Sequence, residues 1–283
     1  MMLRSTLLPL LALATPAFSE CTRETLKAAT SGYIAAAAAG NPSLWTSLSP
    51  SATYAENDTP TPLNKSVFSS PLKLDHTRSF HDTTACSAAT ELIVTNPAKP
   101  YVIHTRMLFT TTTTPPQITT VESVVTTTGD WAFNATGSLY WNSLENWDAI
   151  PLSDRDSREV IKAGGDAYFD RWNNTSVEIP LGTPCARLEG GAYTGNGNLA
   201  ANTCNLGGFP GNIVVTNRRY VVDEELGVVD IFMGFPGLDR NVPARPAPDS
   251  HIFRVQHGKV RYIHTVSHCF TTRCGMTGSV PGM

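Results

Sequence analysis

The sequence predicts the same order of secondary structure, a helix followed by strands, in each half of the chain. The chain must therefore fold into two similar halves. An Ala-rich segment, Thr22 to Ala39, has apolar residues at helical spacing and stops at a Gly-Asn-Pro sequence. Thr22 is a suitable N-cap for this helix. Segments rich in Thr, Val and Ile follow, as is typical of strands, at 74–95, 101–111 and 118–128.

The second copy begins with a helical pattern over residues 154–172. Asp156, with Glu159 three residues later, predicts a capping box at its start. His257-Gly258 predicts a tight turn between the last two strands. The strands of this copy are expected at 213–223, 227–235, 251–256 and 260–269.

The two copies can be aligned position by position, although their identity is low and chance alignment is the alternative. The Arg-to-Asp spacing of four is the same in Arg78–Asp82 and Arg219–Asp223. Residues 189–211 have no counterpart and predict a disulfide-held insertion. We therefore expect domains at 20–148 and 149–283. The other aligned pairs are Tyr33 with Tyr168, Tyr54 with Arg187, Glu56 with Glu189, His104 with His251, and Glu122 with His264.

Residues 1–19 have the pattern of a secretory signal peptide. Arg4 supplies the positive charge, 7–13 the apolar run, and Ala17 and Ser19 the small residues before a cleavage site at Glu20. The apolar run is shorter than the roughly 20 residues that a membrane-spanning helix needs. We therefore expect a protein that is secreted or held in the lumen of the secretory pathway, with no membrane span.

The cysteines also indicate a secreted protein. All six follow the expected cleavage site, and an even number in a secreted chain indicates disulfides. A division near residue 150 leaves two cysteines in the first half, which would pair. The other four allow three pairings. The sequence contains no C-x-x-C, which disfavours zinc, and we expect no metal. The favoured disulfides are Cys21–Cys86, Cys185–Cys204 and Cys269–Cys274.

Five glycosylation sequons also fit secretion and predict a glycoprotein. They begin at Asn57, Asn64, Asn134, Asn173 and Asn174.

Charge and motifs narrow the function classes. The net charge is −3 and no basic run occurs, which argues against nucleic-acid binding. No G-x-S-x-G, G-x-G-x-x-G after a strand, P-loop or H-E-x-x-H is found. We therefore expect a reaction without a cofactor, or no reaction.

Several segments carry a family resemblance, among them 155–160, 182–194, 217–225, 248–251 and 258–264, with 129–136 in the first half. Through these segments, the chain resembles secreted fungal proteins with two NTF2-like domains, which are related to SnoaL-type and ketosteroid-isomerase-like proteins. The resemblance implies an α+β protein of two disulfide-bonded cones, each a helix followed by a bent antiparallel sheet. It also implies an apolar pocket at the wide end of a cone.

Side chains that alternate along the strands supply candidate catalytic groups. His251 and His264 would act as acid and base if both faced the pocket, and Arg219 or Arg187 would stabilise an enolate oxygen. Asp223 and Glu189 would be the nearby carboxylates. The structural alternatives are an Arg219–Asp223 ion pair, a loop contact for His251, a buried hydrogen-bonded His264 and a turn at Glu189.

Two functions follow from this interpretation. The first is a cofactor-independent tailoring enzyme of fungal secondary metabolism, which cyclises, couples or isomerises a polyketide- or terpenoid-like substrate, cycloaddition included. The second is a secreted protein that binds a small apolar ligand or a partner without catalysis. Both allow a homodimer.

Overall fold

The computed structural model describes residues 21–195, 197–205, 207–271 and 273–274, so the expected signal peptide lies outside the described residues. Within these ranges, no helix is both long enough and apolar enough to cross a membrane.

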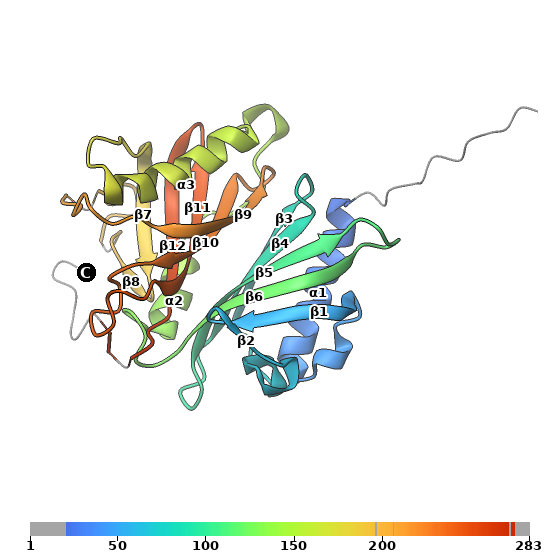
Figure 1. The fold of residues 1–283 in the computed structure, drawn as a ribbon. Helices are drawn as coiled ribbons and strands as arrows, with labels where there is room; N and C mark the ends of the chain where they lie inside the picture. The colour runs from blue at the N-terminus through green and yellow to red at the C-terminus, as the bar shows by residue number, and fades with distance from the viewer. Residues whose placement is uncertain (1–20, 196, 206, 272, 275–283) are drawn as a thin grey trace, which may run out of the picture.

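The first half is a helix followed by a six-stranded sheet (Figure 1). Helix α1 spans Arg23–Ala39, and three short 3-10 helices lie at Pro42–Leu44, Leu63–Lys65 and Val67–Ser69. The sheet order is β2-β1-β6-β5-β4-β3. The strands are β1 (Leu48–Glu56), β2 (Thr59–Pro60), β3 (His76–Asp82), β4 (Ser87–Val94), β5 (Tyr101–Thr110) and β6 (Gln117–Thr126).

The second half repeats this plan with the sheet order β8-β7-β12-β11-β10-β9. The connection contains α2 (Ala135–Asn142) and a 3-10 helix at Leu152–Asp154, and α3 spans Arg158–Asn173. The strands are β7 (Leu181–Glu189), β8 (Ala192–Tyr193), β9 (Thr216–Asp223), β10 (Val228–Phe235), β11 (Ala247–Gln256) and β12 (Lys259–Ser267).

The predicted α+β class with two helix-plus-sheet halves is confirmed, with one correction. The sheets are mixed rather than antiparallel, because β1 pairs parallel with β6 and β7 pairs parallel with β12. Strands β1 and β7 were not expected from the sequence, because a Pro within each, Pro50 and Pro184, weakens the strand pattern. The segment 74–95 is two strands, β3 and β4, joined by a turn.

The helix starts were predicted with mixed success. Thr22 caps α1 as expected, since its side chain accepts from the Thr25 N–H. The capping box at Asp156 is wrong. Ser157 is the N-cap of α3, and Asp156 instead accepts the Gly258 N–H of the β11–β12 turn.

The two sheets pack against each other, with a helix on the outer face of each (Figure 1). Apolar clusters join the halves across this interface. One contains Phe80 and Ala89 of the first sheet with Val221, Val228 and Ile252 of the second, and a further cluster joins Ile93 and Val102 to Phe232 and Val266. The molecule therefore has four layers, in the order helix, sheet, sheet, helix.

Two ion pairs repeat the symmetry of the halves across this interface. Arg23, at the start of α1, binds Asp223 at the end of β9 with distances of 2.9 and 3.0 Å. Arg158, at the start of α3, binds Asp82 at the end of β3 with distances of 2.6 and 2.7 Å. Each Asp also accepts a backbone N–H of the opposite half. The alignment of Asp82 with Asp223 is therefore confirmed.

Replacing Asp82 with Asn should lower the free energy of unfolding by about 1–3 kcal/mol, because the buried carboxylate would lose its charge-assisted bonds to Arg158. The symmetric variant Asp223→Asn should cost a similar amount. Chemical denaturation measures both, with exposed Asp154→Asn as the control. Unchanged midpoints for Asp82→Asn and Asp223→Asn would show that these pairs do not hold the halves together.

All three predicted disulfides are confirmed: Cys21–Cys86, Cys185–Cys204 and Cys269–Cys274. Disulfides are typical of proteins that fold in an oxidising compartment.

The sequons lie at different depths. Asn57 is half-buried and its amide nitrogen donates to the Val125 carbonyl, so this side chain is already engaged. The other four are exposed: Asn64, Asn134, Asn173 and Asn174.

Candidate functional site

The interior of the second half, between its sheet and α3, contains an unusual group of buried polar side chains. Strand β11 places Asp249 and His251 on this face, because they alternate with Ser250 and Ile252. The register pairs His251 with Thr265 and Asp249 with Ser267 on β12. Arg187 lies on β7, beside β12.

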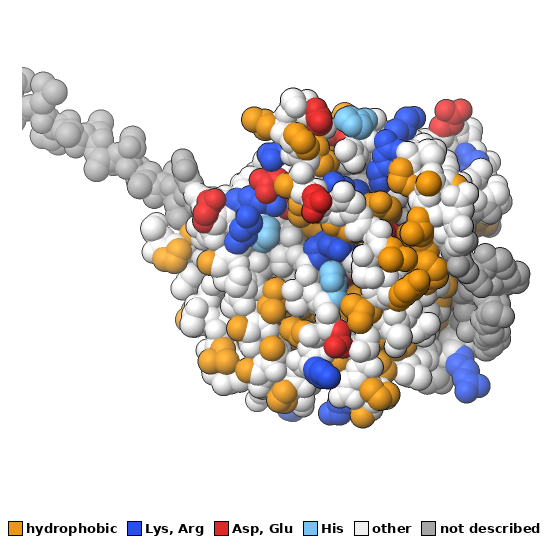
Figure 2. All heavy atoms as spheres, turned by 180° about the vertical axis from the view of Figure 1, so that it is seen from behind, with side chains coloured by type: hydrophobic (Ala, Val, Ile, Leu, Met, Phe, Trp, Pro, Cys, Tyr) orange, Lys and Arg blue, Asp and Glu red, His pale blue; other side chains and the backbone are white. Residues whose placement is uncertain are grey.

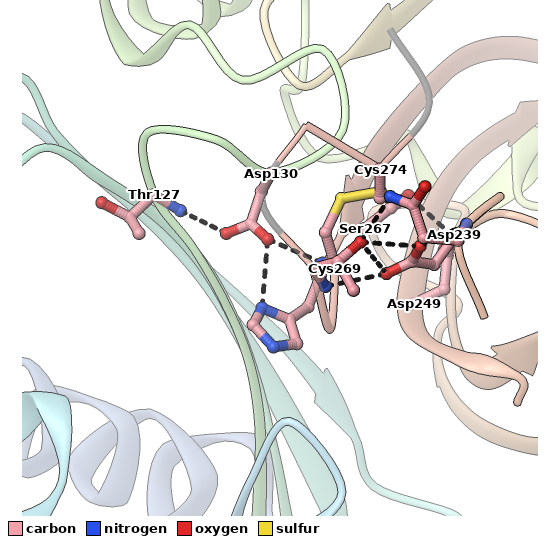
Figure 3. The surroundings of a disulfide bond; sticks show 10 residues. Thr127, Asp130, Asp239, Asp249, Ser267, Cys269 and Cys274 are labelled. Atoms are coloured by element: carbon pink, nitrogen blue, oxygen red, sulfur yellow. Dashed lines mark hydrogen bonds and ion pairs between the residues drawn. A yellow bond between two sulfur atoms is a disulfide. The ribbon is translucent and has the colours of Figure 1, made fainter.

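His251 is oriented by a carboxylate and enclosed by aromatic rings. Its Nδ1 lies 2.7 Å from Oδ1 of Asp249. Oδ2 of Asp249 accepts the Ser267 hydroxyl at 2.7 Å, and Figure 3 shows these two residues. An ionised carboxylate only accepts, so the proton of a neutral ring lies on Nδ1 and Nε2 presents its lone pair. Nε2 has no hydrogen-bond partner among the described residues. The enclosing rings are Tyr168, Phe169 and Phe253, with centroids 5.6, 4.9 and 5.9 Å from the imidazole.

Arg187 supplies a buried cation with unused donors. It is 1% exposed, and its Nη2 donates to Glu189. Its Nε and Nη1 have no partner in the described part of the chain, and neither does the hydroxyl of Thr265. Buried donors without partners cost free energy, so a ligand that accepts from Arg187 would be stabilised here.

Tyr168 completes the group. Burial raises the pKa of its phenol, and the charges of Arg187, Glu189 and Asp249 act on the same hydroxyl. The phenol is therefore a neutral donor at physiological pH, close to the cation and both carboxylates.

A pocket of about 230 Å³ lies at the outer end of this interior. Its lining includes Phe209, whose ring is 6.0 Å from that of Tyr168. Tyr168 therefore contacts both Phe209 and His251, whereas His251, Arg187 and Asp249 do not line the pocket itself.

The first half has no such group at the matching positions. The pairings Glu56–Ser123–Thr105 and Glu189–Thr265–His251 place Thr105 where the second half has His251. The predicted match of His104 with His251 is therefore wrong by one residue. The same register places Tyr54 at the Arg187 position and Ile103 at the Asp249 position.

The polar side chains of the first half bind one another. The Tyr33 hydroxyl lies 2.7 Å from that of Thr105, which lies 2.8 Å from that of Ser123. Tyr54 donates to Glu56 at 2.9 Å. This interior is a closed hydrogen-bonded core, whereas the second half keeps a cation and an imidazole nitrogen available.

The five predicted catalytic residues divide between two faces of the second sheet. Glu189 and His251 belong to the interior site. His264 lies opposite Ile252 in the register, so it faces the interface between the halves. The expected meeting of His251 with His264 is therefore wrong, because it requires both to lie on one face. Arg219 and Asp223 also lie at the interface and form no ion pair with each other: Arg219 contacts Glu122 and Asp58, and Asp223 binds Arg23.

His264 is the centre of a buried network between the halves. Its Nδ1 lies 2.9 Å from Glu91 and its Nε2 lies 2.6 Å from Glu145. Burial lowers its pKa, but the two carboxylates outweigh burial and raise the pKa to about 9. For Glu91, burial raises the pKa, but His264 and hydrogen bonds from histidines outweigh it and hold the pKa well below its usual range. A charged His264 between two carboxylates stabilises the interface and has no open position for a substrate.

A second group of hydrogen-bonded side chains crosses the interface between the halves. His104 Nδ1 lies 2.9 Å from the Ser250 hydroxyl, which donates to Asp230 at 2.7 Å. Burial raises the pKa of Asp230 to about 6. These residues also connect the two sheets.

Sequence reasoning missed Asp249 and Tyr168 as site residues. Asp249 is in β11, but Pro246 and Pro248 made this segment resemble a loop, and the strand was expected only from residue 251. The signal available was the alternation Asp249, His251, Phe253, which places all three on one face.

A family model and a solved structure are similar to parts of this chain. The family described as Domain of unknown function (DUF8021) matches residues 154–267, which contain α3 and β7 to β12. An NTF2-like protein of unknown function from Shewanella baltica OS155 is similar in structure, with 11% identity and a TM-score of 0.28, covering 37% of this chain and 94% of that chain. No curated protein sequence matches.

Proposed function

We propose that the second half is a cofactor-independent acid–base enzyme that acts on a small molecule with an enolisable carbonyl. The observation that carries this proposal is the buried guanidinium of Arg187, with unused N–H groups, in the same interior as the His251–Asp249 pair. These are the two components that proton abstraction next to a carbonyl requires.

In this reaction, Nε2 of His251 takes the proton from carbon while Nδ1 donates to Asp249. Asp249 fixes the tautomer and stabilises the imidazolium that forms, and Ser267 holds Asp249 in place. The carbonyl oxygen gains negative charge as the C–H bond breaks, and Arg187 donates to it. The proton then returns from His251 to another carbon, or the enolate carbon attacks a carbonyl carbon of the same molecule and the oxygen of that carbonyl takes the proton from His251.

The aromatic enclosure favours a largely apolar substrate. Tyr168, Phe169 and Phe253 would hold its carbon skeleton near His251, and this positioning can supply much of the acceleration of a cyclisation. The resemblance to secreted fungal tandem NTF2-like proteins supports a tailoring role in secondary metabolism. The proposed reaction is cyclisation or isomerisation of a polyketide- or terpenoid-like compound.

Binding without catalysis is the second candidate. The unused donors of Arg187 favour it equally, because they would bind a carboxylate or carbonyl ligand whether or not a proton moves.

Metabolite profiling of a gene deletion, with the parent strain under expressing conditions as the control, separates the two. The enzyme proposal expects a lost product and an accumulated uncyclised or unisomerised precursor. An unchanged set of products with altered export or amount of one compound would support the binding protein and overturn the catalytic role.

A further inference from the structure

A larger pocket, of about 400 Å³, lies at the open end of the first half and is distinct from the His251 site. We call it the junction pocket, because its lining comes from the first half except for His268, which follows β12 of the second half. It contains none of the residues of the proposed catalytic group.

Three segments far apart in the sequence each contribute a lysine to this pocket. Lys65 ends a 3-10 helix, Lys73 precedes β3, and Lys99 lies in the loop between β4 and β5. The whole chain has six lysines, so half of them line one pocket. Within the described ranges, none of these three has a carboxylate within ion-pair distance. Basic side chains that converge on a concave surface without counter-ions attract an anion.

The carboxylates of the pocket are already engaged by the protein. Glu56 accepts from the Tyr54 hydroxyl and the Val67 N–H, both at 2.9 Å. Asp130 accepts the backbone N–H groups of Thr127 and Cys269 (Figure 3). Its Oδ1 also lies 3.1 Å from Nδ1 of His268. These hydrogen bonds stabilise the two carboxylates without removing their charges, so the lining carries three positive lysines against two negative carboxylates.

The chain as a whole has a net charge of −3, so the junction pocket differs in charge from the average surface. On the face seen in Figure 2, basic and acidic side chains are interspersed. We propose that the junction pocket binds a small polyanion with several carboxylate or phosphate oxygens through Lys65, Lys73 and Lys99. This inference goes beyond the proposed function and does not depend on it.

Isothermal titration of the purified full chain with citrate, and separately with inorganic pyrophosphate, at constant ionic strength tests the proposal. We expect saturable binding of at least one of them at a single site, weakened by added salt. A preference between the two distinguishes a carboxylate from a phosphate ligand.

The triple variant Lys65→Gln, Lys73→Gln, Lys99→Gln should weaken binding by about tenfold or more, because it removes three positive charges that attract the anion. Lys259→Gln, which removes an exposed lysine elsewhere, should bind as the wild type does. Absent or unsaturable binding of both anions, or equal loss in Lys259→Gln, would overturn the proposal.

Discussion

Replacing His264 with Gln should lower the free energy of unfolding by about 3–5 kcal/mol, the cost of removing one partner from a buried ion pair. Glu145 would lose the charged ring that lies 2.6 Å from it. Glu91 would lose the ring at 2.9 Å but keep its bond to Arg78 at 3.0 Å. The lost stability should come from the interface between the halves, because Glu91 belongs to the first half and His264 to the second.

The same histidine predicts a dependence of stability on pH. Its pKa rises from an unfolded value of 6.5 to about 9 in the folded protein. A raised pKa means that the folded state holds the proton more tightly. The contribution is therefore complete below about pH 6.5 and is lost as pH rises through 9. A shift of this size corresponds to roughly 3 kcal/mol.

Urea denaturation between pH 6 and 10 measures this effect. The wild type should lose stability across the window from 6.5 to 9, and His264→Gln should lose less. His257→Asn is the matched control, because His257 is exposed and Asn tolerates its positive φ of 55°. Parallel pH profiles for the wild type and His264→Gln would contradict a charged His264 at the interface.

Replacing His251 with Gln should lower turnover by about 100- to 10,000-fold, the usual contribution of a general base. Turnover is measured on the precursor that metabolite profiling of the gene deletion identifies. Arg187→Gln should lower turnover by a factor of about 100 to 1,000, because it removes a donor to the developing oxyanion. Steady-state kinetics with purified variants measures both.

The first half supplies matched controls for these variants. Tyr54→Phe and Thr105→Ser change the positions that correspond to Arg187 and His251 and should leave turnover unchanged. Thermal unfolding confirms that each variant is folded. Loss of turnover in the controls, or full turnover in His251→Gln, would place the chemistry outside the second interior.

Local patterns were enough to predict the repeat and the Cys21–Cys86 disulfide, whereas the other four cysteines still allowed three pairings. The helix from Thr22, the strand patterns and the division of cysteines between the halves each depend on neighbouring residues or on simple counting. Strands β1 and β7 were missed because Pro50 and Pro184 interrupt them, and they pair parallel with strands far along the chain. Such pairing leaves no mark on the strand's own sequence.

The candidate site was harder to predict because it depends on register and on which face is buried. His251 and His264 differ by 13 positions, and only the pairing of Ile252 with His264 shows that they lie on opposite faces. Both faces of the second sheet are buried, one by α3 and one by the first sheet. The pattern of apolar residues along the strands therefore could not show on which face each histidine lies. A site residue and an interface residue therefore looked alike in the sequence.

The most direct test of the central claim is a crystal structure of the protein bound to the compound identified by metabolite profiling. We expect this compound to lie inside the second half, with an oxygen accepting from Arg187 and a carbon beside Nε2 of His251. Finding it inside the first half, or at the interface beside His264, would contradict the claim.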